Sequence, residues 1–136
     1  MTADREGSPP KPVHAGVPAP LVAAATLVTV EAVLLVLQGA AEMASISGER
    51  AVMGITTSVF FLIYGGGLAF CAWALSRLRS WARAPVVVAQ LIQVFVAWSF
   101  RGGDTTAIAV GLGMVAILVL LAVFHPASID ALADDG

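Results

Sequence analysis

The sequence predicts an all-α protein, a four-transmembrane-helix bundle with short loops and a disordered N-terminal tail. Of its 136 residues, 59% are hydrophobic and 12% are charged, whereas a soluble domain carries about 25% charged residues. The apolar residues also gather into four stretches, each close to the roughly 20 residues that cross a bilayer as a helix. Lipid is therefore the expected solvent, and no length remains for a catalytic domain.

The two ends of the chain are polar and short. Residues 1–20 hold five of the seven prolines together with Gly, Ser and mixed charges, a composition with too little apolar surface to offset chain entropy. We therefore expect a disordered cytoplasmic tail at 1–20 and the transmembrane domain at 21–124. Residues 125–136 are expected to form a second short cytoplasmic tail.

Local signals delimit the apolar spans. Pro18 and Pro20 precede the first span, and the basic segment SRLRSWAR follows the second. Pro85 suits the first turn of the third helix, because an amide hydrogen at that position would have no acceptor within the helix. Asp104 is the candidate N-cap of the fourth helix. These signals predict spans at about 21–44, 52–74, 84–100 and 105–124.

The distribution of basic residues predicts the orientation. With the N-terminus inside, five of the seven Lys and Arg residues are cytoplasmic and only Arg50 and Arg101 lie outside, as the positive-inside rule requires. We therefore expect a multi-pass plasma-membrane protein with both termini in the cytoplasm. The linker after the second span is interpreted as a topology determinant, or alternatively as a contact for anionic lipid headgroups; its residues are Arg77, Arg79, Trp81 and Arg83.

Glu31 is the one charged residue predicted to lie near the middle of a membrane span. It lies ten residues into the first span, about 15 Å along the helix and close to the bilayer midplane. An acidic side chain at that depth costs at least about 2.5–3.5 kcal/mol on insertion scales. Glu31 is therefore expected to face protein or water, or to be protonated.

Helical spacing predicts which polar residues meet. Gln38 and Glu42 share the helix stripe of Glu31, and Gln90 and Gln93 of the third span lie at the depth of Glu31. Tyr64 of the second span is a further candidate donor to Glu31. A second polar contact is predicted near the outer surface, between Glu42 and either Arg101 or Arg50.

Two interpretations of Glu31 stay open at this point. In the first it is a hydrogen-bonded packing residue that orders the helices. In the second it exchanges protons or holds a cation, as intramembrane carboxylates in transporters do.

Several functional classes are not expected from the composition. The net charge of −2, without any basic run, does not favour nucleic-acid binding. The single cysteine, Cys71, has no Cys/His cluster around it that would hold a metal. Because no nucleophile and base can be paired on these spans, we expect neither an enzyme nor a cofactor.

The order of features along the chain resembles that of a known group of proteins. A proline-containing tail precedes a first span with an embedded acid, SRLRSWARAPVVVAQLIQ at 76–93 leads into a span ending AWSF, and the last span closes on FHPASIDAL. Over roughly residues 21–132 the chain resembles small four-span integral membrane proteins of actinobacteria. The resemblance implies a plasma-membrane location and a four-helix fold, and transfers no functional residue. In size and topology the chain is also similar to small multidrug-resistance transporters, which are four-span chains with one membrane-embedded glutamate in the first span. Apart from Glu31, the chain lacks the sequence of that family.

The sequence therefore predicts a non-enzymatic polytopic membrane protein, an accessory or interaction subunit that packs within the plasma membrane. Its expected partners are membrane lipid and a membrane protein complex or further copies of itself. The alternative is a small proton-coupled transporter that uses Glu31. A carrier needs a water-accessible path to this carboxyl group, whereas a structural glutamate is shielded by its neighbours.

Overall fold

The structure, a computed structural model, describes residues 16–133, and within that range every regular element is helical. The all-α fold class is therefore confirmed. The predicted tail falls mainly on residues 1–15, which lie outside the described range. Five α-helices follow one another: α1 (Ala19–Ala44), α2 (Ala51–Ser76), α3 (Arg83–Ser99), α4 (Thr106–Val123) and α5 (Pro126–Ala133).

Four helical stretches are long and apolar enough to cross a membrane. Short 3₁₀ turns extend three of them, so these stretches run Gly48–Ser76, Ser80–Ser99 and Gly103–Val123, beside α1 itself. The turn Ser80–Ala82 lengthens the third and shortest span at the side of Trp81. By length and composition, the chain is a multi-pass membrane protein.

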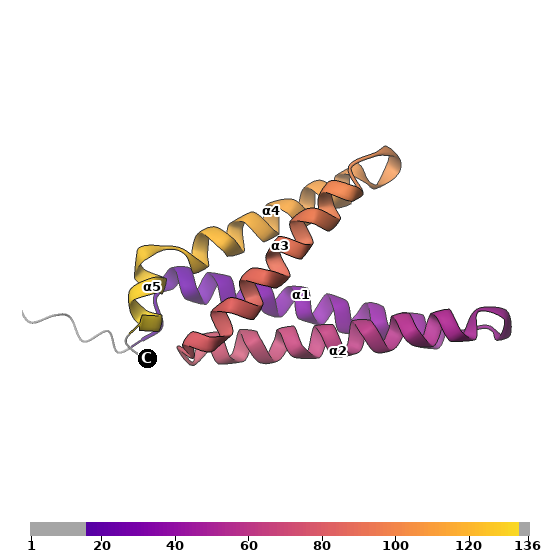
Figure 1. The fold of residues 1–136 in the computed structure, drawn as a ribbon, viewed down its shortest axis with the longest axis horizontal. Coiled ribbons are helices and arrows are strands. Elements are labelled where there is room, and N and C mark those ends of the chain that lie inside the picture. The colour runs from indigo at the N-terminus through magenta and orange to yellow at the C-terminus, as the bar shows by residue number, and fades with distance from the viewer. Residues whose placement is uncertain (1–15, 134–136) are drawn as a thin grey trace, which may run out of the picture.

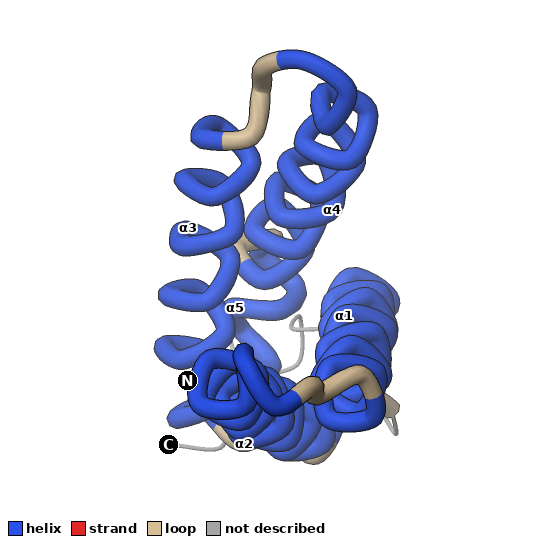
Figure 2. The backbone as a smooth tube through the Cα atoms, turned by 90° about the vertical axis from the view of Figure 1, so that its right-hand side faces the viewer, coloured by secondary structure: helices blue, strands red, loops and turns tan. Residues whose placement is uncertain are grey.

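The four long helices form two antiparallel hairpins that meet at an angle. The most extensive contact joins α1 to α2, and the next joins α3 to α4. Figure 1 shows the two hairpins close together at the end that carries α5 and diverging toward the other end. Figure 2 shows the α3–α4 pair rising away from the α1–α2 pair. We call the end of the molecule with α5 and linker 77–82 the closed end. We call the opposite end, with loops 45–50 and 100–105, the open end.

The hydrophobic core occupies the closed half of the molecule. It combines the first part of α1, the last part of α2, the start of α3, the end of α4 and one residue of α5. Because this packing does not continue into the open half, the hairpins have no shared core there. The fully buried core residues include Leu21, Val28, Leu75, Val86, Val119 and Val123.

The α1–α2 hairpin is held close by two glycines, one on each helix. A Cβ on Gly39 would lie 3.1 Å from the backbone oxygen of Ser58, and a Cβ on Gly65 would lie 3.1 Å from the backbone oxygen of Ala32. Small residues allow this approach of helix backbones, and interhelical contact in lipid depends on such packing. The first hairpin is therefore the more tightly built of the two.

The segment after Phe124, expected to be a short tail, contains the helix α5. The Nδ1 atom of His125 accepts a hydrogen bond from the amide of Ala127 at 3.2 Å and begins the helix. The buried Ser128 then donates to the carbonyl of Ala122 at 2.7 Å, and Leu132 joins the core. These contacts turn the chain back onto α1 and α4.

Asp104 is not the N-cap of α4. A 3₁₀ turn, Gly103–Thr105, contains Asp104, and α4 begins directly after this turn, at Thr106, with Thr105 in the capping position. No side chain caps that helix; the hydroxyl of Thr106 donates to the carbonyl of Gly103 at 2.8 Å. The predicted start therefore moves by one residue because the backbone tightens into a 3₁₀ turn.

Gly65→Leu is expected to destabilise the α1–α2 hairpin by about 1–3 kcal/mol, the range for overpacking. The new side chain would have to displace Val36, Leu35 or the backbone of Ala32. Thermal unfolding in detergent, followed by circular dichroism, measures the loss. Gly66→Leu is the matched control, because a Cβ there meets nothing within 4 Å. Equal unfolding temperatures for the two variants would contradict this account of the hairpin.

Candidate functional site

Glu31 lies where the two hairpins touch. Its side chain is 8% exposed, and both of its carboxylate oxygens accept hydrogen bonds from α3. Nε2 of Gln90 donates to Oε2 at 2.8 Å, and Nε2 of Gln93 donates to Oε1 at 3.0 Å. The structure therefore brings together three of the predicted intramembrane polar residues. We call Glu31, Gln90 and Gln93 the Glu31 site.

Gln93 extends this site to a third helix. The same Nε2 donates to the backbone carbonyl of Leu112 in α4 at 3.0 Å, so both hydrogens of the amide group are used. A chain of side-chain hydrogen bonds thus joins α1 to α3 and α3 to α4 at one level. Sequence reasoning missed the α4 partner, because a backbone carbonyl leaves no signal in the residue types.

The Glu31 site marks the boundary between the packed and the diverging halves. On α1, six of the seven buried residues lie between Leu21 and Ala32, and the seventh, Gly39, packs against α2. Leu34, one turn past Glu31, is already 61% exposed. The carboxylate therefore lies at the last point where α1 is covered by the second hairpin.

Tyr64 does not join this site by hydrogen bonding. Among the described residues, no hydrogen bond links its hydroxyl to Glu31; its ring instead stacks on Phe60, with ring centroids 5.7 Å apart and planes 6° apart. Tyr64 packs at the edge of the core. The donors to the carboxylate group of Glu31 come from α3 instead.

The predicted outer contact of Glu42 with Arg101 or Arg50 is absent. Gln38 donates to Glu42 at 3.1 Å within α1; the side chain of Gln38 is exposed, and that of Glu42 is partly buried. The guanidinium of Arg101 lies over the ring of Trp98, 3.5 Å from its centroid. The prediction assumed parallel spans at matched depths, whereas loops 45–50 and 100–105 diverge at the open end (Figure 1).

The predicted basic linker lies at the closed end among aromatic rings. Arg77 lies over Trp73 at 5.4 Å, and Arg83 lies over Phe124 at 5.1 Å. Phe70 packs between Trp73 and Trp81, with ring centroids 5.7 and 5.5 Å away. Arg79 is exposed, as Arg77 is. Aromatic residues of this kind favour the membrane–water interface.

The α2–α3 linker turns at Leu78, which has a φ of 59°. The amide of Arg79 donates to the carbonyl of Ala74 at 2.9 Å, and the amide of Leu78 donates to that of Leu75 at 3.0 Å. This is a Schellman motif with leucine where glycine is usual. Packing of Leu78 against the core offsets the unfavourable backbone and directs the arginines away from it.

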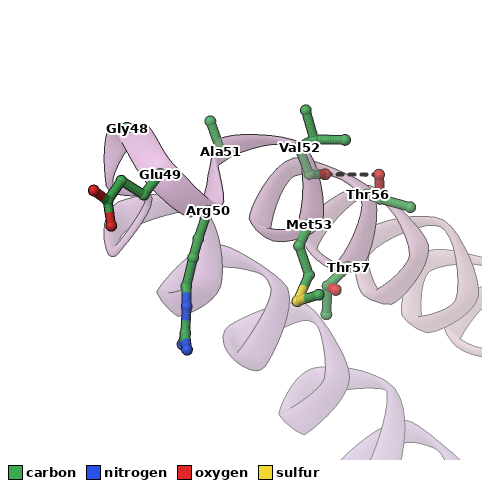
Figure 3. A pocket seen from close by; sticks show the side chains of 8 residues that line it. All are labelled: Gly48, Glu49, Arg50, Ala51, Val52, Met53, Thr56 and Thr57. Atoms are coloured by element: carbon green, nitrogen blue, oxygen red, sulfur yellow. Dashed lines mark hydrogen bonds between the residues drawn. The ribbon is translucent and has the colours of Figure 1, made fainter.

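A surface depression of about 720 Å³ lies at the open end, beside the loop that contains Glu49 and Arg50. Figure 3 shows these two side chains pointing away from each other, and the hydrogen bond drawn there joins Thr56 to the carbonyl of Val52. None of the lining residues belongs to the Glu31 site. Nowhere between residues 16 and 133 do three His, Cys, Asp or Glu side chains gather as metal ligands would.

No protein-family model, curated protein or solved structure matches the chain.

Gln93→Leu is expected to lower the free energy of unfolding by about 1 kcal/mol, because two interhelical hydrogen bonds are lost at roughly 0.6 kcal/mol each. Gln38→Leu is the matched control: it also removes a glutamine bond to a glutamate, but at an exposed position within one helix. Reversible unfolding in mixed micelles compares the two. A larger loss in Gln38→Leu would show that the Glu31 site does not hold the hairpins together.

Proposed function

We propose that the protein is a non-enzymatic accessory or interaction subunit, which packs through its membrane-facing surface against another membrane protein or a second copy of itself. The observation that carries this proposal is an apolar stripe on α4. Val110, Met114, Ile117 and Leu121 follow at spacings of four, three and four, and each is more than half exposed. Such spacing lets one helix pack along another in a left-handed crossing.

The internal packing of α4 supports this use of the stripe. Ala109, Ala116, Val119 and Val123 are buried against the rest of the chain, and they lie on the other side of the helix. Helix α4 contains no charged or amide side chain that would restrict the exposed face to one polar partner. The helix is thus held on one side and available on the other.

The polar residues on α1 add a second reason to expect a protein neighbour. The hydrogen-bonded pair of the exposed Gln38 and the partly buried Glu42 shares the stripe of Glu31. It lies beyond Glu31 along α1, where the second hairpin has diverged. Gln38 is six residues from the end of α1, or about 9 Å. A lipid tail offers this amide no hydrogen-bond partner, whereas a neighbouring protein helix does.

Proton-coupled transport is the second candidate, and the charge environment of Glu31 favours it. The partners of its carboxylate are neutral amides, and carboxylates that take part in transport bind and release protons at such positions. The shielding of Glu31, at 8% exposed, supports the first candidate, because a carrier must open a path to this group.

The location and the lipid contacts belong to the same proposal. We expect the plasma membrane, with both termini in the cytoplasm and the closed end on the cytoplasmic side. There Arg77, Arg79 and Arg83 would meet anionic headgroups. Membership of a small actinobacterial four-span family likewise stays a prediction.

A photoreactive benzoylphenylalanine in place of Ile117 or Met114 is expected to form cross-links to protein in native membranes, because the α4 stripe lies in the interface. Phe95→benzoylphenylalanine is the size-matched control on α3, at a side chain 72% exposed. Mass spectrometry of the adducts separates a second copy from another protein. Lipid adducts alone, at Ile117 as at Phe95, would sink the interaction proposal.

Glu31→Gln separates the two candidate functions. As an interaction subunit the variant should keep its cross-links at Ile117, because that residue lies on the exposed face of α4, whereas the substitution changes one acceptor of the buried Glu31 site. As a proton-coupled transporter it should lose proton flux, measured in proteoliposomes with an entrapped pH-sensitive dye. Proton flux in the wild type that the variant abolishes would favour transport, and equal flux in the two proteins would contradict a transport role of Glu31.

A further inference from the structure

The Glu31 site contains one buried polar side-chain atom that lacks a hydrogen-bond partner. Gln90 is fully buried, and its Oε1 accepts no hydrogen bond, although Nε2 of the same amide donates to Glu31. Buried amide oxygens are almost always paired. Oε1 is bonded to the same carbon atom as Nε2, which is the atom that contacts the carboxylate group of Glu31.

The carboxylate itself meets no positive charge. On α1 the other charged residue is Glu42, at the open end; on α3 it is Arg83, at the closed end over Phe124. Helix α2 contributes the titratable but uncharged Tyr64 and Cys71, and α4 contributes no titratable side chain. An ionised carboxylate buried away from water is costly unless it is paired with a charge.

One proton on Glu31 would account for both the unpaired oxygen of Gln90 and the absence of a positive charge beside the carboxyl group. We propose that Glu31 is a proton-binding site in the folded protein, and that the proton lies between Oε1 of Glu31 and Oε1 of Gln90. The acid and the amide then form a ring of two hydrogen bonds, in which Nε2 of Gln90 donates to Oε2 and the new O–H donates to the unpaired oxygen. The proton comes from water, an O–H bond forms on Glu31, and no other covalent bond changes.

The rest of the site is compatible with this arrangement. A protonated carboxyl oxygen still accepts a hydrogen bond, so Gln93 can keep its 3.0 Å contact with Oε1. Its second bond, to the carbonyl of Leu112, is not involved. Without the proton, Oε1 of Gln90 would lack a hydrogen-bond donor at the point where the hairpins join.

The proposal does not depend on the interaction function or on transport. It concerns the resting state of one side chain, so that a structural glutamate and a carrier glutamate would both show it. The cross-linking and flux experiments can give negative results while the proton is present on Glu31. They can also give positive results while the proton is absent.

Infrared difference spectroscopy tests the proposal on the full-length protein in phosphatidylcholine nanodiscs. Wild type minus Glu31→Gln at neutral pH is expected to show the C=O stretching band of a protonated carboxyl group, with the small shift in deuterium oxide that an exchangeable O–H produces. A difference spectrum with carboxylate bands alone at neutral pH would overturn the proposal.

The two glutamines provide the matched comparison. Gln90→Leu is expected to move the acid band to higher frequency, because the group loses both partners in the ring. Gln93→Leu should move it less, since the ring is kept. Equal shifts in the two variants would contradict a proton held by Gln90. Circular dichroism confirms folding, and Gln90→Met, an unbranched replacement, serves if Gln90→Leu does not fold.

Discussion

The hydrogen bonds from Gln90 and Gln93 to Glu31 join the two halves of this protein. Within a bilayer, apolar side chains gain little by leaving lipid for protein, so contacts between helices depend on close packing and on polar bonds. The two hairpins share such bonds at one level, and Gln93 carries the connection on to the backbone of α4. These three side chains therefore join the hairpins by polar contacts at one level, beside the apolar core of the closed end.

The remaining packing is uneven, and this unevenness has a physical origin. Helices α1 and α2 approach closely because Gly39 and Gly65 place backbone against side chain and carbonyl. The second hairpin meets the first through larger residues at the closed end, and α5 covers that end through Ser128 and Leu132. Beyond Glu31 nothing of comparable fit holds the hairpins together, so they diverge.

This architecture separates a shielded polar interior from an apolar exterior. Glu31 is enclosed by neutral amides, whereas the α4 stripe and the outer part of α1 face away from the chain's own core. The proposed interaction function uses the exterior, and the proposed proton uses the interior. The two are coupled only through the angle of the hairpins, which the Glu31 site helps to set.

Sequence by itself predicted four apolar spans, their approximate limits and the contact of Glu31 with Gln90 and Gln93. These are local properties, since hydropathy, proline position and helical spacing depend on neighbouring residues alone. Only the tertiary structure decided the angle between the hairpins, and with it the absence of a contact between Glu42 and Arg101. It also decided that Tyr64 stacks on Phe60, that Leu112 supplies a carbonyl to Gln93 and that residues 126–133 fold as a helix. Each of these depends on how side chains distant in sequence fill shared space, and no periodicity along one helix contains that information.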